Sequence, residues 1–195
     1  MMRTFLATTA LFTALGAAAQ ADMARYDLDP EHTVVYFTVD HIGYAKTLGI
    51  FTELDGTFMY DAESRELGEV SVAIDAASVN TFNERRDGHV RNSDFLHVSD
   101  HPEITFVATG GTASGDTTGT VTGDLTILGV TQPVTLDVML NKAEAYPFGL
   151  MRDGRGLSMG TTIQRSAFGM DYAVANGLVG DEVTIRIETE AMKMD

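Results

Sequence analysis

The chain has 195 residues, with 13 basic and 28 acidic side chains and a formal net charge of −15. So acidic a surface repels nucleic acid and anionic lipid headgroups, and no basic cluster is rich enough to reverse this. The absence of cysteine excludes disulfides, thiolate metal sites and thiol catalysis, and a chain of this size does not need such cross-links to fold.

The first 21 residues read as a cleaved signal peptide. A positive start at Arg3 precedes an apolar run over 4–19, and Ala19-Gln20-Ala21 matches the small-x-small pattern before a cleavage site. The run is too short and too soon followed by charge to predict a transmembrane helix. We therefore expect export and a single mature domain over residues 22–195.

Period-two alternation of apolar and polar residues dominates the mature sequence and predicts half-buried strands. In chain order the apolar parity occurs within 35–39, 70–74, 104–106, 121–127, 134–140 and 183–187. The segment 48–60 changes parity between Phe51 and Leu54, which indicates a β-bulge, with Gly49 and Gly56 at the bend.

One stretch, residues 81–92, breaks the alternation and predicts a short helix. Thr81 and Glu84 have the spacing of a capping box, and Asp87 and Arg91 have the i,i+4 spacing at which opposite charges meet. With turn signals between the remaining runs, the chain is predicted to be all-β, an antiparallel barrel of about eight strands with this one helix inserted.

The predicted inward-facing side chains are all aliphatic or aromatic. A barrel of this size either packs its interior with side chains or holds a ligand, and composition cannot distinguish the two. If the interior is hollow, its lining predicts an acyl or isoprenoid chain. The predicted interior residues are Phe37, Val39, Leu54, Phe58, Ile74, Phe106, Leu125, Ile127, Leu136 and Val138.

Three patterns bear on other chemistry. Gly156-Leu-Ser158-Met-Gly160 matches a nucleophile pattern, but it continues into a strand and no histidine follows His101, so we read it as small residues on a barrel strand. His97 and His101 have i,i+4 spacing without a third ligand, so no metal site is predicted. The basic cluster over 85–91 is either a solvated face or a site for an anion or headgroup at the barrel mouth.

These motifs resemble the YceI-like polyisoprenoid-binding family. The resemblance covers residues 25–192 and rests on seven stretches: His32 to Gly43, Gly49 to Gly56, Val72 to Val79, Arg86 to Phe95, His101 to Phe106, Val121 to Thr131, and Arg165 to Met170. It implies a lipocalin-like barrel in the bacterial periplasm, with a lipid tail in a central tunnel. Tyr44-Ala45-Lys46 and Leu96-His97 depart from the usual family pattern.

The resulting hypothesis is a periplasmic protein that carries or stores a polyisoprenoid or an isoprenoid quinone and catalyses nothing. No cofactor is expected other than this lipid. Alternatives are a module that hands lipid to a membrane partner, and a lipid hydrolase or lyase that uses Ser158 or His89; a homodimer is left open. The expected ligand contacts are Phe37, Val39, His41, Phe51, Phe58, Ile74, Arg86, His89, Arg91, Phe95, Phe106, Leu125, Ile127, Leu136 and Phe168.

Overall fold

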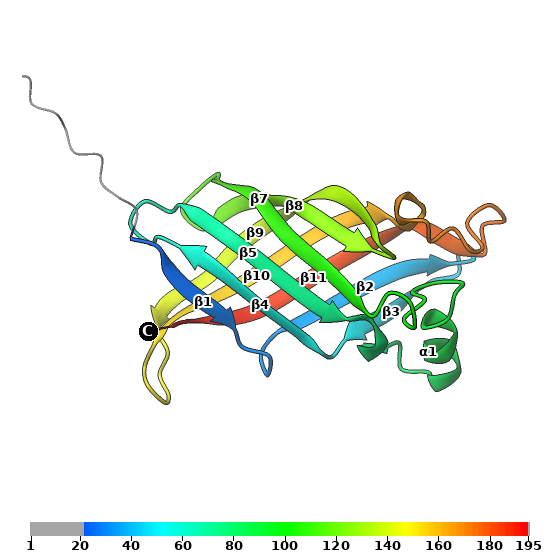
Figure 1. Ribbon diagram of the computed structural model, residues 1–195, viewed down its shortest axis with the longest axis horizontal. Coiled ribbons are helices and arrows are strands. Elements are labelled where there is room, and N and C mark those ends of the chain that lie inside the picture. The colour runs from blue at the N-terminus through cyan, green and yellow to red at the C-terminus, as the bar shows by residue number, and fades with distance from the viewer. Residues whose placement is uncertain (1–21, 195) are drawn as a thin grey trace, which may run out of the picture.

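The computed structural model describes residues 22–194, which form an elongated barrel with a helix at one end (Figure 1). The predicted signal peptide, residues 1–21, lies outside the described residues. The strands are β1 (Ala24–Leu28), β2 (Val34–His41), β3 (Ala45–Phe51), β4 (Leu54–Tyr60), β5 (Leu67–Asp75), β6 (Val79–Asn80), β7 (Glu103–Ala113), β8 (Thr118–Ile127), β9 (Val130–Ala145), β10 (Asp153–Gln164) and β11 (Val179–Lys193). Three short helices complete the fold: η1 (Ala76–Ser78), α1 (Glu84–Val90) and η2 (Arg165–Phe168).

Eight antiparallel strands close the barrel, in the order β1-β4-β5-β7-β8-β9-β10-β11, and β11 pairs back to β1. This confirms the predicted fold class. Closure removes the exposed sheet edges that would otherwise favour aggregation.

Two pairs of consecutive strands each share one position in the barrel. Both β1 and β2 pair with β11, β1 near Lys193 and β2 from Val179 to Glu188, so the turn between them interrupts one long strand. In the same way β3 pairs with β2 and β6, whereas β4 pairs with β1 and β5. The strands β2, β3 and β6 therefore extend the barrel wall at the end near α1 (Figure 1).

The parity change predicted over 48–60 takes place at residues 52 and 53, between β3 and β4. Phe51 and Leu54 both face the interior across this break. The two glycines have a different role from the one predicted: a Cβ at Gly49 would lie 2.3 Å from Phe37 Cζ, and one at Gly56 would lie 2.6 Å from Leu28 Cδ1. At both positions an apolar side chain packs directly over the glycine backbone, so a larger residue would require that side chain to shift.

The helix α1 falls within the predicted range, but the predicted capping box is wrong. Asn83 is the N-cap, and its side chain accepts a hydrogen bond from the Arg86 amide. Thr81 lies two residues before this cap, and its hydroxyl and amide both donate to Asp87 Oδ1, at 2.5 and 2.7 Å. Arg91 donates to the carbonyl oxygens of Ala77 and Val79. The side chains of Asp87 and Arg91 thus bind the segment before the helix.

Candidate functional site

The barrel interior holds a cavity of about 380 Å³, which is within the usual range for small-molecule sites. Its lining comes from both ends of the molecule. At the end opposite α1 it includes Arg65 and Asp116, from the β4–β5 and β7–β8 hairpins, which form an ion pair at 3.4 Å. At the other end it includes Phe95 and Leu96, which follow α1, and Phe168 of η2.

Strand alternation explains why the lining is apolar. On β9, Val134, Leu136, Val138 and Leu140 face the cavity, while the intervening Met139 is 44% exposed on the outside. The same rule holds on the other long strands. Eleven of the predicted contacts line the cavity: Phe37, Val39, Phe51, Phe58, Ile74, Phe95, Phe106, Leu125, Ile127, Leu136 and Phe168.

The four predicted polar contacts do not line the cavity, so the head-end prediction does not match the geometry. His41 is exposed at the end of β2, where it pairs with Ala45 of β3 and Val179 of β11. Arg86 donates to the hydroxyl and carbonyl oxygens of Thr81. Arg91 similarly binds backbone carbonyls, as described above. The hydrogen bonds of both arginines therefore attach α1 to the segment that precedes it.

His89 lies one side chain away from the cavity. Its Nε2 is 2.8 Å from Asp94 Oδ2, and its ring makes edge contacts with Phe95 and Tyr172, with centroids 5.0 and 5.3 Å apart. Phe95 and Tyr172 also contact each other at 5.2 Å. Phe95 lines the cavity at the α1 end, and the rings of His89 and Tyr172 pack against it.

Two buried arginines that sequence reasoning missed do line the cavity. Arg155 is 8% exposed and forms a bidentate ion pair with Asp153, and its guanidinium lies 5.2 Å from the Tyr26 ring centroid. The Tyr26 hydroxyl donates to the same carboxylate at 2.9 Å. Burial, followed by this hydrogen bond, raises the pKa of Tyr26 to about 12. The three side chains form a polar cluster at the end opposite α1.

Arg165 is the second buried arginine, at 3% exposure. It donates to the backbone carbonyls of Met170, Tyr172, Val179 and Gly180 at 2.7–3.0 Å, and its guanidinium lies 5.7 Å from the Phe95 ring centroid. Burial lowers the pKa of this guanidinium from its ordinary value. A parity signal was available for both arginines: Arg155 on β10 and Arg165, the residue directly after β10, share the inward parity of Leu157, Met159 and Ile163.

Ser158 is placed inside β10 and not on the strand-to-helix turn that a nucleophile of this pattern requires. Its hydroxyl donates to Glu188 Oε2 at 2.5 Å and accepts from Asn141 Nδ2 at 2.7 Å. Asn141 lies on β9 and Glu188 on β11, so these hydrogen bonds link β10 to both neighbouring strands. This placement agrees with the interpretation of small residues on a barrel strand.

The groups that could hold a metal are not those that histidine spacing singled out. His97 and His101 stack edge to face at 5.9 Å, and His97 also lies 3.5 Å from Asp100. The described residues instead bring Asp29, His32 and Glu190 together, with one ligand atom from each within 4.8 Å of the others. Sequence could not join Glu190 to this group, because a long-range strand pairing brings it there.

The structure contains no candidate for a membrane-spanning helix within residues 22–194, where every helix is too short.

Comparison with known proteins identifies the family. The model of the YceI-like domain matches residues 26–191. A UPF0312 protein of Azotobacter vinelandii is 36% identical over 195 residues, which cover 99% of this chain and 100% of the relative. Burkholderia cenocepacia BcnA has a similar structure, with a TM-score of 0.76 at 24% identity, over 85% of this chain and 100% of BcnA. A polyisoprenoid-binding domain from Saccharophagus degradans gives a TM-score of 0.66 at 16% identity, over 87% and 98% of the two chains. The chain therefore belongs to the YceI-like family.

Proposed function

We propose that this protein binds a long apolar lipid, a polyisoprenoid or an isoprenoid quinone, inside its barrel and carries or stores it in the periplasm. The observation that supports this most directly is the cavity of about 380 Å³, whose lining joins apolar side chains from both ends of the barrel. A barrel with a fully packed interior would offer no such space.

The energetics of such a site favour a long hydrocarbon. Each CH₂ group transferred from water into an apolar interior contributes about 0.8 kcal/mol. A chain of several isoprene units therefore has a large gross driving force, from which the costs of ordering the chain and of losing its translational freedom are subtracted. A short or polar molecule gains too little from this lining to compete.

Polar specificity would come from a few groups at the ends of the cavity. Arg155 and Arg165 are the two buried cations in the lining, one near each end. Most of their donors already serve Asp153 or backbone carbonyls, so they present a limited number of free N–H groups. Binding by such a site needs no covalent step, and we propose a binding protein and not an enzyme.

Two further observations support the proposal. The related fold from S. degradans is described as a polyisoprenoid-binding domain. The N-terminal pattern before Asp22 has the features of a signal for export, which agrees with a carrier that works in the periplasm. The proposed alternative, a module that delivers lipid to a membrane partner, uses the same cavity.

The test is native mass spectrometry of the protein purified from its own periplasm, followed by extraction and identification of the lipid. The blocking variant is Val138→Trp, because Val138 lines the cavity and a tryptophan ring at this position would fill part of its volume. The matched control is Met139→Trp, the same change at the next residue, which faces outward. Melting temperatures verify that both variants fold.

We expect the wild type and Met139→Trp to carry one prenyl or quinone molecule per chain, and Val138→Trp to carry at least tenfold less. A wild-type protein that has no bound lipid and takes up no added isoprenoid would overturn the proposal. So would a folded Val138→Trp variant with unchanged lipid content, since the lipid would then lie outside the cavity.

A further inference from the structure

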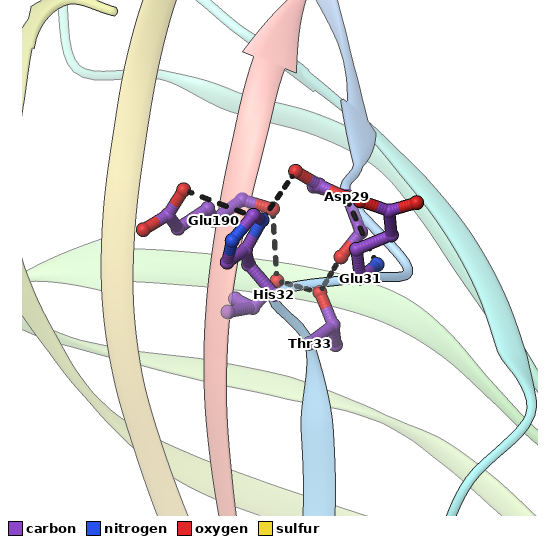
Figure 2. Close-up of polar contacts among 6 residues, drawn as sticks. Asp29, Glu31, His32, Thr33 and Glu190 are labelled. Carbon is purple, nitrogen blue, oxygen red and sulfur yellow. Dashed lines mark hydrogen bonds and ion pairs between the residues drawn. The ribbon is translucent and has the colours of Figure 1, made fainter.

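The turn between β1 and β2, residues 29–33, brings three metal-ligating side chains together on the barrel wall. Both strands pair with β11, and the Asp29 amide donates to the carbonyl oxygen of Glu190 on that strand at 2.8 Å. Figure 2 shows His32 between Asp29 on the turn and Glu190 on β11. The three side chains thus come from two segments about 160 residues apart that the barrel closure holds in register.

The ligand atoms lie at distances that suit a single cation. His32 Nδ1 forms a hydrogen bond with Asp29 Oδ2 at 2.8 Å and lies 4.0 Å from Glu190 Oε2, and the candidate ligand atoms of the three residues lie within 4.8 Å of one another. In a tetrahedral zinc site with bonds of about 2.0–2.1 Å, neighbouring ligand atoms are about 3.3 Å apart. Shifts of less than about 1 Å in exposed side chains would give that spacing.

A second and independent observation concerns Glu190. Its Oε2 atom is buried from solvent and has no hydrogen-bond partner among residues 22–194, although the side chain as a whole is 39% exposed. A hydrogen bond with the Glu190 side chain raises the pKa of Tyr146. A buried carboxylate oxygen without a partner is costly, and a bound cation would remove that cost.

The other two oxygen atoms of Asp29 already accept hydrogen bonds, which orients its side chain. Its Oδ1 accepts from the Glu31 amide at 2.9 Å, and its carbonyl oxygen accepts from the His32 amide and from the Thr33 hydroxyl at 3.1 and 2.6 Å. These bonds leave Oδ2 directed toward His32. Glu31 adds a further negative charge beside the group (Figure 2).

We propose that Asp29 Oδ2, His32 Nδ1 and Glu190 Oε2 bind a divalent transition-metal ion of the Zn²⁺ class. One imidazole nitrogen with two carboxylate oxygens is a donor set that Zn²⁺ accepts, with water in the remaining position. The imidazole disfavours Mg²⁺ and Ca²⁺, which prefer oxygen ligands. The ion would link the β1–β2 turn to β11 and stabilise the junction at which two short strands share one position in the barrel. This site is separate from the proposed lipid function.

The experiment measures binding of Zn²⁺, Mg²⁺ and Ca²⁺ to the processed protein after treatment with EDTA, by titration calorimetry and native mass spectrometry. The test variants are His32→Ala and Glu190→Gln, which each remove one ligand. The matched control is His97→Ala/His101→Ala, which removes two neighbouring histidines outside the proposed site. Thermal melting with and without Zn²⁺ reports whether each variant folds and whether the ion stabilises it.

We expect one Zn²⁺ per chain, an increase in melting temperature on binding, and affinity for Zn²⁺ well above that for Mg²⁺ or Ca²⁺. His32→Ala and Glu190→Gln should weaken Zn²⁺ binding at least tenfold and abolish the increase, and the control should retain both. The proposal is overturned if the wild type binds no Zn²⁺, if Ca²⁺ binds more tightly than Zn²⁺, or if folded test variants bind Zn²⁺ as the wild type does.

Discussion

At the scale of single residues, Asp87 is the carboxylate that holds the segment between β6 and α1. It is 7% exposed and accepts two hydrogen bonds from Thr81. Burial alone would raise the pKa of Asp87, but the bonds from the Thr81 hydroxyl and amide and the charges of Arg91 and Arg86 lower it below its ordinary value. The folded state therefore prefers the ionised carboxylate.

This preference predicts how stability depends on pH. Because the pKa of Asp87 is lower in the folded state, its contribution is complete above the ordinary carboxyl pKa of about 3.9 and is lost as pH falls through the lowered value. Asp87→Asn should lower the free energy of unfolding by about 1–2 kcal/mol at pH 7, and the difference from wild type should shrink below about pH 4. Urea unfolding at pH 7 and pH 3 measures it.

The control for this variant is Asp116→Asn, since the Asp116 side chain is 95% exposed and makes only a surface ion pair with Arg65. We expect it to change the free energy of unfolding by less than about 0.5 kcal/mol at either pH. If Asp87→Asn were as stable as the wild type at pH 7, Asp87 would not hold the segment as argued.

The direction of apolar side chains could be predicted from sequence, residue by residue, and the partners of polar ones could not. Period two fixes which face Phe37, Val39 or Leu136 takes, because the alternation is a property of the strand itself. Arg86 and Arg91 were expected near a lipid headgroup, yet both bind nearby carbonyl oxygens. A long cation has many acceptors within reach, and sequence does not rank them.

At the scale of elements, the helix α1 could be predicted but its start could not. Thr81 and Asn83 are both good N-cap residues, and the capping-box spacing favoured Thr81. In the structure Thr81 instead bonds Asp87, because Phe82 has a positive φ of 63° that turns the chain before the helix begins. The Phe82 amide also donates to Asn80 Oδ1 at 2.8 Å, and the capping-box spacing does not detect a turn of this kind.

The segment between η2 and β11, residues 169–178, depends on Arg165 for its position. This segment has little regular structure, and Arg165 bonds carbonyl oxygens on it and at the start of β11. The planar guanidinium serves four acceptors at once, whereas an ammonium group has three donors and no fixed fork. The arginine is therefore an organising element of the α1 end and not an exchangeable charge.

We predict that Arg165→Lys lowers the free energy of unfolding by at least about 2 kcal/mol, since buried carbonyl oxygens lose charged donors. Hydrogen exchange should show the largest loss of protection within residues 169–180. The control is Arg25→Lys, because Arg25 is exposed and its side chain forms an ion pair with Asp27 on its own strand. Unchanged protection of residues 169–180 in Arg165→Lys would contradict this role.

At the scale of the whole molecule, the strand count and closure could be inferred, but the branching of the wall could not. The alternating runs and the turn signals between them predict a barrel of about eight strands. That β1 and β2 share one position, and β3 and β4 another, follows from their pairing with β11, β5 and β6. The pairings with β11 and the pairing of β3 with β6 join residues at least 28 positions apart, for which local patterns carry no information. The cavity is likewise a property of the closed wall.

The net charge leads to a last prediction, which concerns how the proposed carrier exchanges lipid with membranes. A chain with a formal charge of −15 is repelled by an anionic bilayer, and the repulsion reaches about 30 Å at 0.01 M salt and about 3 Å at 1 M. Uptake of an isoprenoid should therefore be several-fold slower from vesicles rich in phosphatidylglycerol than from phosphatidylcholine vesicles at low salt, and equal at 1 M salt. A fluorescent prenyl probe follows the transfer, with Val138→Trp as the blank. Equal rates at low salt would mean that a local uncharged surface, and not the net charge, governs the encounter.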